Sequence, residues 1–161
     1  MAVDPKKARY WLNLYSESHE NPINILLHEI GVPCIAFGIL SFLSLLRWPD
    51  ASIHLNLAIP FIATYTIVYA RLGWFYCLAI TAEFALIYAL VISVGQTQPY
   101  PLAIYAGVFF IGWLLQFIGH WIEGKAPAAM KSPKHSAAFT LMAPLFTLDI
   151  LAKRLGMKGP Q

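Results

Sequence analysis

Long apolar runs separated by short polar segments dominate the chain. Four of them are each close to the ~20 residues that a helix needs to cross a bilayer, and they cover 30–47, 53–70, 72–94 and 101–121. The segments between them are short and turn-like. The second and third runs nearly abut, so we expect them to form a tight antiparallel hairpin. The pattern predicts an all-α fold, a polytopic membrane helix bundle with about four transmembrane helices.

The polar N-terminal part of the chain predicts two further helical features. Residues 4–18 carry aromatic and apolar side chains at helical spacing behind a basic start, which is typical of a helix that lies in a membrane interface. Asn21 and Pro22 follow, a good N-cap residue and a residue favoured in the first helical position. We therefore expect an N-terminal interfacial helix to end before a new helix begins at this pair.

The last apolar stretch, 136–152, is shorter than the others and contains Pro144 and Asp149. Cytoplasmic segments of membrane proteins are enriched in Lys and Arg. With four spans and a cytoplasmic N-terminus, Arg47 alone among the 11 Lys and Arg falls on the outer side. This count favours a C-terminal interfacial or re-entrant helix over a fifth span, with both termini in the cytoplasm.

Composition agrees with a membrane protein. Of the 161 residues, 58% are hydrophobic and 12% are charged, whereas about a quarter are charged in soluble domains. We expect one integral membrane domain over 1–161, with interfacial helices in 1–29, a four-span core in 30–121, and a loop and C-terminal helix in 122–161. The net charge of +3 is explained by topology and lipid headgroups, so no nucleic-acid partner is expected.

Two polar clusters flank the apolar region. His19 and His28 precede the first span, and His120 follows the fourth. In the predicted topology all three lie at the cytoplasmic face. Nine residues along one straight helix would put His19 and His28 on opposite faces, so a shared site requires the chain break expected at 21–22.

Helical spacing adds further polar groups to these clusters. Asn24 and His28 are four residues apart, and His120 and Glu123 are three apart, so each pair shares a helix face. Imidazole and carboxylate together suit iron, zinc or manganese, and the spacing does not choose among them. A set of polar residues that only contacts headgroups is the alternative interpretation.

Three further polar residues, His54, His135 and Glu83, lie outside the two clusters. His54 lies at the opposite face and is expected to be structural, while His135 follows a loop-like segment and is expected to contact headgroups. Glu83 lies in the middle of the third span, where carboxylates are costly. It either bonds to a nearby tyrosine or takes part in substrate binding.

The two clusters match fixed motifs. They read Tyr15-x3-His19-x-Asn21-x2-Asn24-x3-His28-x-Ile30-Gly31-x-Pro33 and Gln116-Phe117-Ile118-Gly119-His120-x2-Glu123-Gly124-Lys125 with Pro127, and a weaker match is Ala143-Pro144-Leu145. In these motifs the chain resembles the 2-hydroxy fatty acid dioxygenase family, small membrane proteins of fungi and bacteria. The resemblance runs from residue 15 to about 150. Ala126 departs from it, since many members carry a second basic residue there.

The resemblance implies an Fe(II)-dependent dioxygenase of fatty acid α-oxidation, which uses dioxygen to shorten a 2-hydroxy fatty acid by one carbon at the membrane interface. It implies three iron ligands, His19, His28 and His120. Glu123 would be a fourth ligand or a partner that orients a ligand histidine, and Asn21 and Asn24 would donate hydrogen bonds to the substrate carboxylate or to oxygen. The membrane would be the inner membrane in a bacterium or the endoplasmic reticulum in a fungus.

Two other classes remain open. One is a metal-dependent membrane hydroxylase or hydrolase acting on lipids with zinc or two irons, although di-iron membrane hydroxylases use more histidines than the five present here. The other is a non-enzymatic membrane scaffold or metal carrier. The sequence leaves open the chain length and stereochemistry of the substrate, the number of irons and the oligomeric state.

Overall fold

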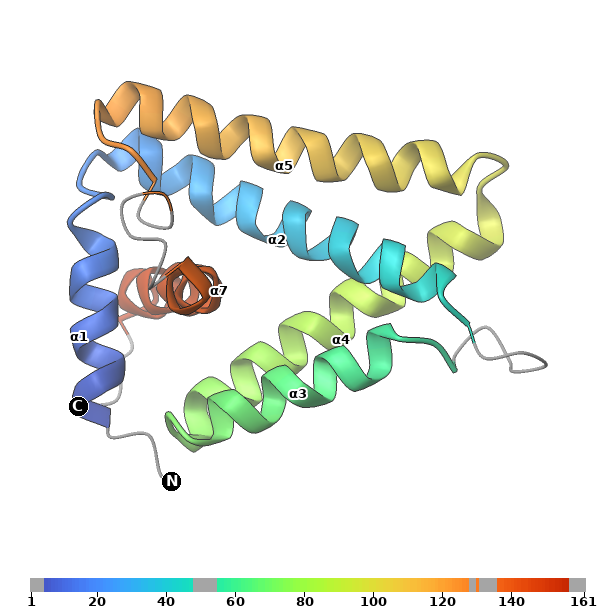
Figure 1. Cartoon of the computed structure of the whole chain (residues 1–161), viewed down its shortest axis with the longest axis horizontal. Helices are drawn as coiled ribbons and strands as arrows, with labels where there is room; N and C mark the ends of the chain where they lie inside the picture. Colours follow the sequence, from blue (N-terminus) through green and yellow to red (C-terminus); the bar gives the residue numbers. More distant parts are fainter. Residues whose placement is uncertain (1–4, 48–54, 128–129, 131–135, 157–161) are drawn as a thin grey trace.

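The computed structural model describes residues 5–47, 55–127, 130 and 136–156, which form six helices and no strand. Figure 1 shows their arrangement. The helices are α1 (Pro5–Ser16), α2 (Pro22–Leu45), α3 (Ala58–Ala70), α4 (Trp74–Thr97), α5 (Pro101–Glu123) and α7 (Ser136–Arg154). The predicted all-α, polytopic helix bundle is confirmed.

Helices α2 and α5 run antiparallel and lie against each other along their lengths (Figure 1). Glycines make this close approach possible. A Cβ atom on Gly31 would lie 3.0 Å from the carbonyl oxygen of Gly112, and one on Gly38 would lie 2.5 Å from the Phe109 Cβ. Small residues let helix backbones approach in this way in membrane proteins.

Helices α3 and α4 form the hairpin predicted for the second and third apolar runs. The turn between them contains Gly73, whose φ of 138° is strained for residues with a side chain. In Figure 1 this hairpin meets the α2–α5 pair at one end and diverges from it at the other, where α1 and α7 lie. The two helix pairs therefore form a wedge, with α1 and α7 at its open end.

Three of the described helices, α2, α4 and α5, are long and apolar enough to cross a membrane. Helix α3 has 13 residues, about 20 Å at 1.5 Å per residue, less than the ~30 Å hydrocarbon core. The predicted second span is thus shorter than expected. The side chain of Asn56 accepts a hydrogen bond from the Ala58 amide at 3.0 Å, and the helix begins only after this turn.

Helix α2 begins at the predicted pair. The Asn21 side chain accepts a hydrogen bond from the Ile23 amide at 2.9 Å, and Pro22 is the first helical residue. From there the helix continues to Leu45 without a break near residue 30, and Pro33 lies inside it. The segment with His28, predicted as interfacial, is therefore the first part of the same long helix.

Helix α7 closes the open end of the wedge. The Arg154 guanidinium forms an ion pair with Glu29 of α2 at 2.9 Å, and the Tyr69 hydroxyl of α3 donates a hydrogen bond to the Leu141 carbonyl. Leu145 is fully buried. These contacts join α7 to both helix pairs.

Candidate metal centre

The structure brings together the three histidines that the sequence predicts as ligands. His19 lies in the turn between α1 and α2, His28 in the second turn of α2, and His120 in the last turn of α5. Their exposed fractions are 3%, 1% and 7%. One ring nitrogen from each lies within 4.8 Å of the other two. The expected chain reversal at Asn21 brings His19 back toward His28.

Hydrogen bonds to backbone carbonyls fix the protonation of two of these rings. Nδ1 of His19 lies 2.7 Å from the Tyr15 carbonyl oxygen, and Nδ1 of His28 lies 2.9 Å from that of Asn24. Because a carbonyl can only accept, each Nδ1 carries the hydrogen, and the Nε2 atom of the neutral ring presents a lone pair. Hydrogen bonds from the other ring nitrogen to a carbonyl or carboxylate orient histidines that bind metals.

The two Nε2 atoms face each other at 3.0 Å. Two lone pairs at this distance repel unless a cation or proton is shared between them. Imidazole nitrogens bind metals at about 2.0–2.1 Å, so neighbouring donors on one ion lie about 3 Å apart. The His120 ring centroid is 4.9 Å from each of the other two. This donor set fits a metal ion.

The Tyr15 ring supports His19 from the side of α1. The two rings are stacked at 4.3 Å with an angle of 6° between their planes. Phe146 of α7 lies 5.0 Å from the Tyr15 ring and 5.1 Å from the His19 ring. Burial raises the pKa of the Tyr15 phenol, so this side chain stays neutral beside the histidines.

Glu123 binds the turn that carries His19. Its carboxylate, with a side chain 4% exposed, accepts hydrogen bonds from the backbone amides of Glu20 at 3.1 Å and Asn21 at 2.9 Å, and from the Asn24 side chain at 3.0 Å. These amides lie at the start of α2, where the helix dipole also favours an anion. Among the described residues the cluster of possible ligands comprises the three histidines alone. The ligand and orienting roles of Glu123 stay predictions.

The two asparagines also bond within the protein. The Asn21 side chain caps α2, as described above, and Nδ2 of Asn24 donates to the Ser18 carbonyl at 3.1 Å as well as to Glu123. Oδ1 of Asn24 lies against α5, where a Cβ atom on Gly119 would approach it to 2.2 Å. Both amides therefore hold the turn against the helices, and their predicted bonds to substrate stay predictions.

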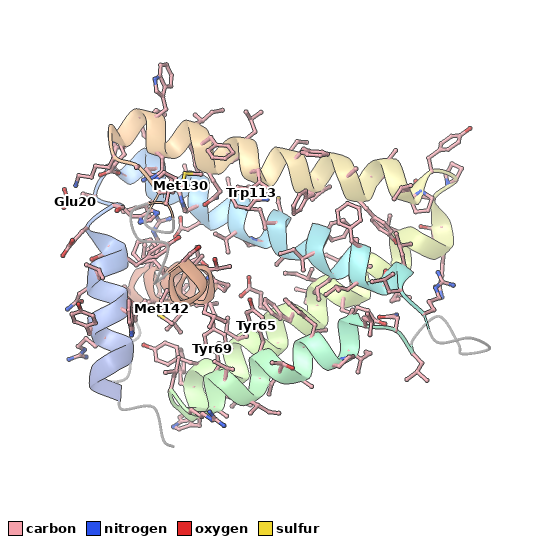
Figure 2. The ribbon with its side chains drawn as sticks, viewed as in Figure 1. Glu20, Tyr65, Tyr69, Trp113, Met130 and Met142 are labelled. Atoms are coloured by element: carbon pink, nitrogen blue, oxygen red, sulfur yellow. The ribbon has the colours of Figure 1, made fainter. Side chains whose placement is uncertain are left out.

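Lys125 joins the end of α5 to the same turn. Its ammonium donates to the Glu17 carbonyl and to the Glu20 carboxylate, each at 2.8 Å. The hydrogen bond with Glu20 raises the pKa of Lys125. Gly124 ends α5 with a left-handed φ of 70°, which turns the chain toward these partners. Figure 2 shows Glu20 at this end of the bundle.

An apolar cavity of about 170 Å³ extends from the histidines into the wedge. His28 and His120 form part of its wall, and Tyr65 of α3 and Trp113 of α5 line it from opposite helix pairs (Figure 2). The remaining walls are mostly apolar and include Val32, Ile35, Ala36, Ile39, Phe61, Phe84, Phe117, Ala143 and Pro144. Gln116 also lines the cavity. It belongs to the second motif, but no role was predicted for it, and its position one turn before His120 was the available signal.

The remaining polar candidates lie elsewhere. Glu83 does not line this cavity, and its buried Oε2 atom has no hydrogen bond to any described residue. Tyr88, a tyrosine on the same helix as Glu83, accepts a hydrogen bond from the Asn56 side chain at 2.9 Å. His54 and His135 fall outside the residues that the structure describes, so their interpretations stay predictions.

Comparisons with known proteins agree with the motifs. Residues 6–155 match the family described as 2-hydroxy-palmitic acid dioxygenase Mpo1-like. The chain is 27% identical over 150 residues to the 2-hydroxy-palmitic acid dioxygenase MPO1 of Saccharomyces cerevisiae. The matched region covers 92% of this chain and 81% of the yeast protein. No solved structure matches. The chain therefore belongs to the 2-hydroxy-palmitic acid dioxygenase Mpo1-like family.

Proposed function

We propose that this protein is an Fe(II)-dependent dioxygenase that shortens a 2-hydroxy fatty acid by one carbon. The observation that carries the proposal is the pair of Nε2 atoms of His19 and His28, which lie 3.0 Å apart beside His120, with His28 and His120 in the wall of an apolar cavity. A metal centre and a site for an alkyl chain are thus adjacent. Family membership supports the choice of substrate and reaction.

His19, His28 and His120 would hold the iron. Bound there, Fe(II) supplies the redox chemistry for reaction with dioxygen. The imidazoles are neutral ligands, so the site keeps a positive charge that favours an anionic substrate. The carbonyls of Tyr15 and Asn24 keep the Nε2 atoms of His19 and His28 directed at the centre.

The substrate class follows from the two parts of the site. A 2-hydroxy carboxylate offers two oxygens to the positive centre, and its alkyl chain would occupy the apolar cavity. The reaction balances without an external reductant: R–CH(OH)–COOH + O₂ gives R–COOH + CO₂ + H₂O. The C1–C2 bond breaks, C2 is oxidised to the carboxyl level, and dioxygen takes up the electrons.

The centre would lie at the cytoplasmic face of the membrane. The three histidines lie at one end of the long helices α2 and α5. Lys125, Lys153 and Arg154 follow α5 or lie in α7 near this end, and basic residues accumulate on the cytoplasmic side. A fatty acid in the inner leaflet would then reach the cavity with its carboxylate already near the centre.

The test is iron content and turnover of the purified protein. We expect one iron per chain and conversion of 2-hydroxypalmitic acid to the acid one carbon shorter, with consumption of dioxygen. Alanine at His19, His28 or His120 should abolish stable iron binding, because only two of the three ligands would remain. His54→Ala and His135→Ala are the matched controls and should retain both iron and turnover.

Each alternative class gives a different result in the same measurement. Two irons per chain would indicate a di-iron hydroxylase, and zinc would indicate a hydrolase. Full iron and activity in His120→Ala, or loss of iron in His54→Ala, would contradict the assignment of the ligands.

A further inference from the structure

Gln116 is a buried polar residue that the metal centre does not use. It lies on α5 four residues before His120, on the same face of the helix, and its exposed fraction is 7%. Its side chain lines the apolar cavity together with Trp113 and Phe117. It is therefore a polar group on the side of the centre toward which an alkyl chain would extend.

The amide of Gln116 has no hydrogen-bond partner among the described residues. Its Nε2 atom is buried and unpaired. A glutamine amide carries two N–H donors and a carbonyl acceptor. Buried polar groups in native proteins are nearly always paired, and exceptions call for an explanation such as a functional role. A ligand in the cavity is the explanation that this position allows.

Packing holds the amide in place. A Cβ atom on Gly31 of α2 would lie 2.3 Å from Nε2 and 3.0 Å from the Gly112 carbonyl oxygen. The amide thus occupies space that only a glycine leaves at the contact between α2 and α5. A group fixed by its neighbours in this way is pre-organised for a ligand, because less conformational entropy is lost on binding.

We infer that Gln116 is a positioning residue that forms a hydrogen bond with the 2-hydroxyl group of the substrate. The inference rests on the proposed function. In a 2-hydroxy acid the hydroxyl lies on the carbon next to the alkyl chain, so it is the polar group nearest to the chain side of the centre. A hydroxyl can both donate to the amide oxygen and accept from the amide nitrogen, so either orientation of the amide serves.

The experiment measures binding and stability of Gln116→Met in the iron-loaded protein without dioxygen. Methionine has a similar length and no hydrogen-bonding amide. We expect unchanged iron content and an unfolding temperature equal to or above that of the wild type, because a buried unpaired group is removed. The ratio of affinities for 2-hydroxypalmitic and palmitic acid should fall about tenfold, because the site no longer bonds to the hydroxyl.

Phe117→Leu is the control in the same cavity. It removes apolar contact and should weaken binding of both acids by the same factor, which leaves the ratio unchanged. Gln116→Leu repeats the test with a second apolar side chain. A lower unfolding temperature or a failure to fold in both Gln116 variants would overturn the inference, since it would show that the amide holds the fold.

The outcome also separates this inference from the proposed function. A wild-type protein with iron that does not shorten 2-hydroxypalmitic acid overturns the proposed function. If the wild type shortens the acid and the affinity ratio of Gln116→Met is unchanged, the proposed function stands, and the hydrogen bond assigned to Gln116 is wrong.

Discussion

Hydrogen bonds of Glu123 join the end of α5, which carries His120, to the segment between His19 and His28. Its carboxylate belongs to α5, close to His120, and its three donors belong to the segment between His19 and His28. Two of these donors are backbone amides, which every substitution except proline leaves in place. The carboxylate itself is therefore the group to alter in a test.

Glu123→Gln should weaken iron binding while leaving the helices intact. One carboxylate oxygen becomes an NH₂ group that faces donors, so the turn with His19 loses its fixed position. Loss of such supporting contacts lowers metal affinity about 10–100-fold, measured by iron titration. Glu20→Gln is the control, because its ion pair with Lys125 is exposed and such pairs contribute little. Equal effects of the two substitutions would contradict this role for Glu123.

The sequence predicted the convergence of the three histidines because it depended only on helix ends and one chain reversal. It did not predict what Glu123 and Asn24 bond to. Their shared hydrogen bond, 3.0 Å long, joins residues 99 positions apart, and helical spacing identifies only neighbours on one helix. Spacing along the sequence therefore could not indicate which distant contacts hold the turn with His19 in place.

At the scale of elements, the contact between α2 and α5 sets the distance between His28 and His120. Gly119 lies at this contact beside Asn24. Gly107 lies on the same helix, and nothing is within 4 Å of the Cβ position there. The two glycines form a matched pair.

Gly119→Ala should separate the helices, because the added Cβ atom would lie 2.2 Å from Asn24 Oδ1. Overpacking of this kind costs about 1–3 kcal/mol, and we expect both a lower unfolding temperature and loss of iron. Gly107→Ala should be neutral or stabilising by up to about 1 kcal/mol, since alanine favours the helix. Thermal unfolding and iron content measure both. Equal stability of the two variants would argue against the close contact.

The cavity between the helix pairs makes a second prediction at this scale. Along α2 its wall runs from His28 to Ile39, about 16 Å at 1.5 Å per residue. Ala36→Phe should narrow the cavity and shift the preference toward shorter 2-hydroxy acids. Each methylene displaced from the cavity costs about 0.8 kcal/mol, or about fourfold in affinity.

Competition between 2-hydroxy acids of different length measures this shift. Ile30→Phe is the control, because Ile30 is 50% exposed and is not among the residues that line the cavity. An unchanged preference in Ala36→Phe would indicate that the alkyl chain lies elsewhere, for example in the surrounding lipid.

For the molecule as a whole, the distribution of Lys and Arg predicts a cytoplasmic location for both termini. Single cysteines at Lys158 and Asp50, in a background without Cys34 and Cys77, test this by labelling from each side of the membrane. We expect Lys158→Cys to react from the cytoplasmic side and Asp50→Cys from the opposite side. Labelling of both from the same side would contradict the topology.

The sequence predicted the order of helices and the α3–α4 hairpin, because apolar runs and turn residues are local signals. It did not predict that α3 is 13 residues long, since the turn at Asn56 depends on one hydrogen bond within an apolar region. Nor did it predict the cavity. That depends on the angle between the helix pairs and on the position of α7, and both follow from contacts such as Tyr69 with Leu141.

The three histidines of the candidate centre are far apart in sequence, because α3 and α4 lie between His28 and His120. During synthesis His19 and His28 leave the ribosome well before His120. A nascent chain that ends before α5 has two of the three histidines and lacks the helix that carries the third, so we expect it not to retain iron. If the centre holds iron as proposed, it can assemble only after the chain has been made as far as His120, and shorter chains would carry no iron that could oxidise membrane lipid.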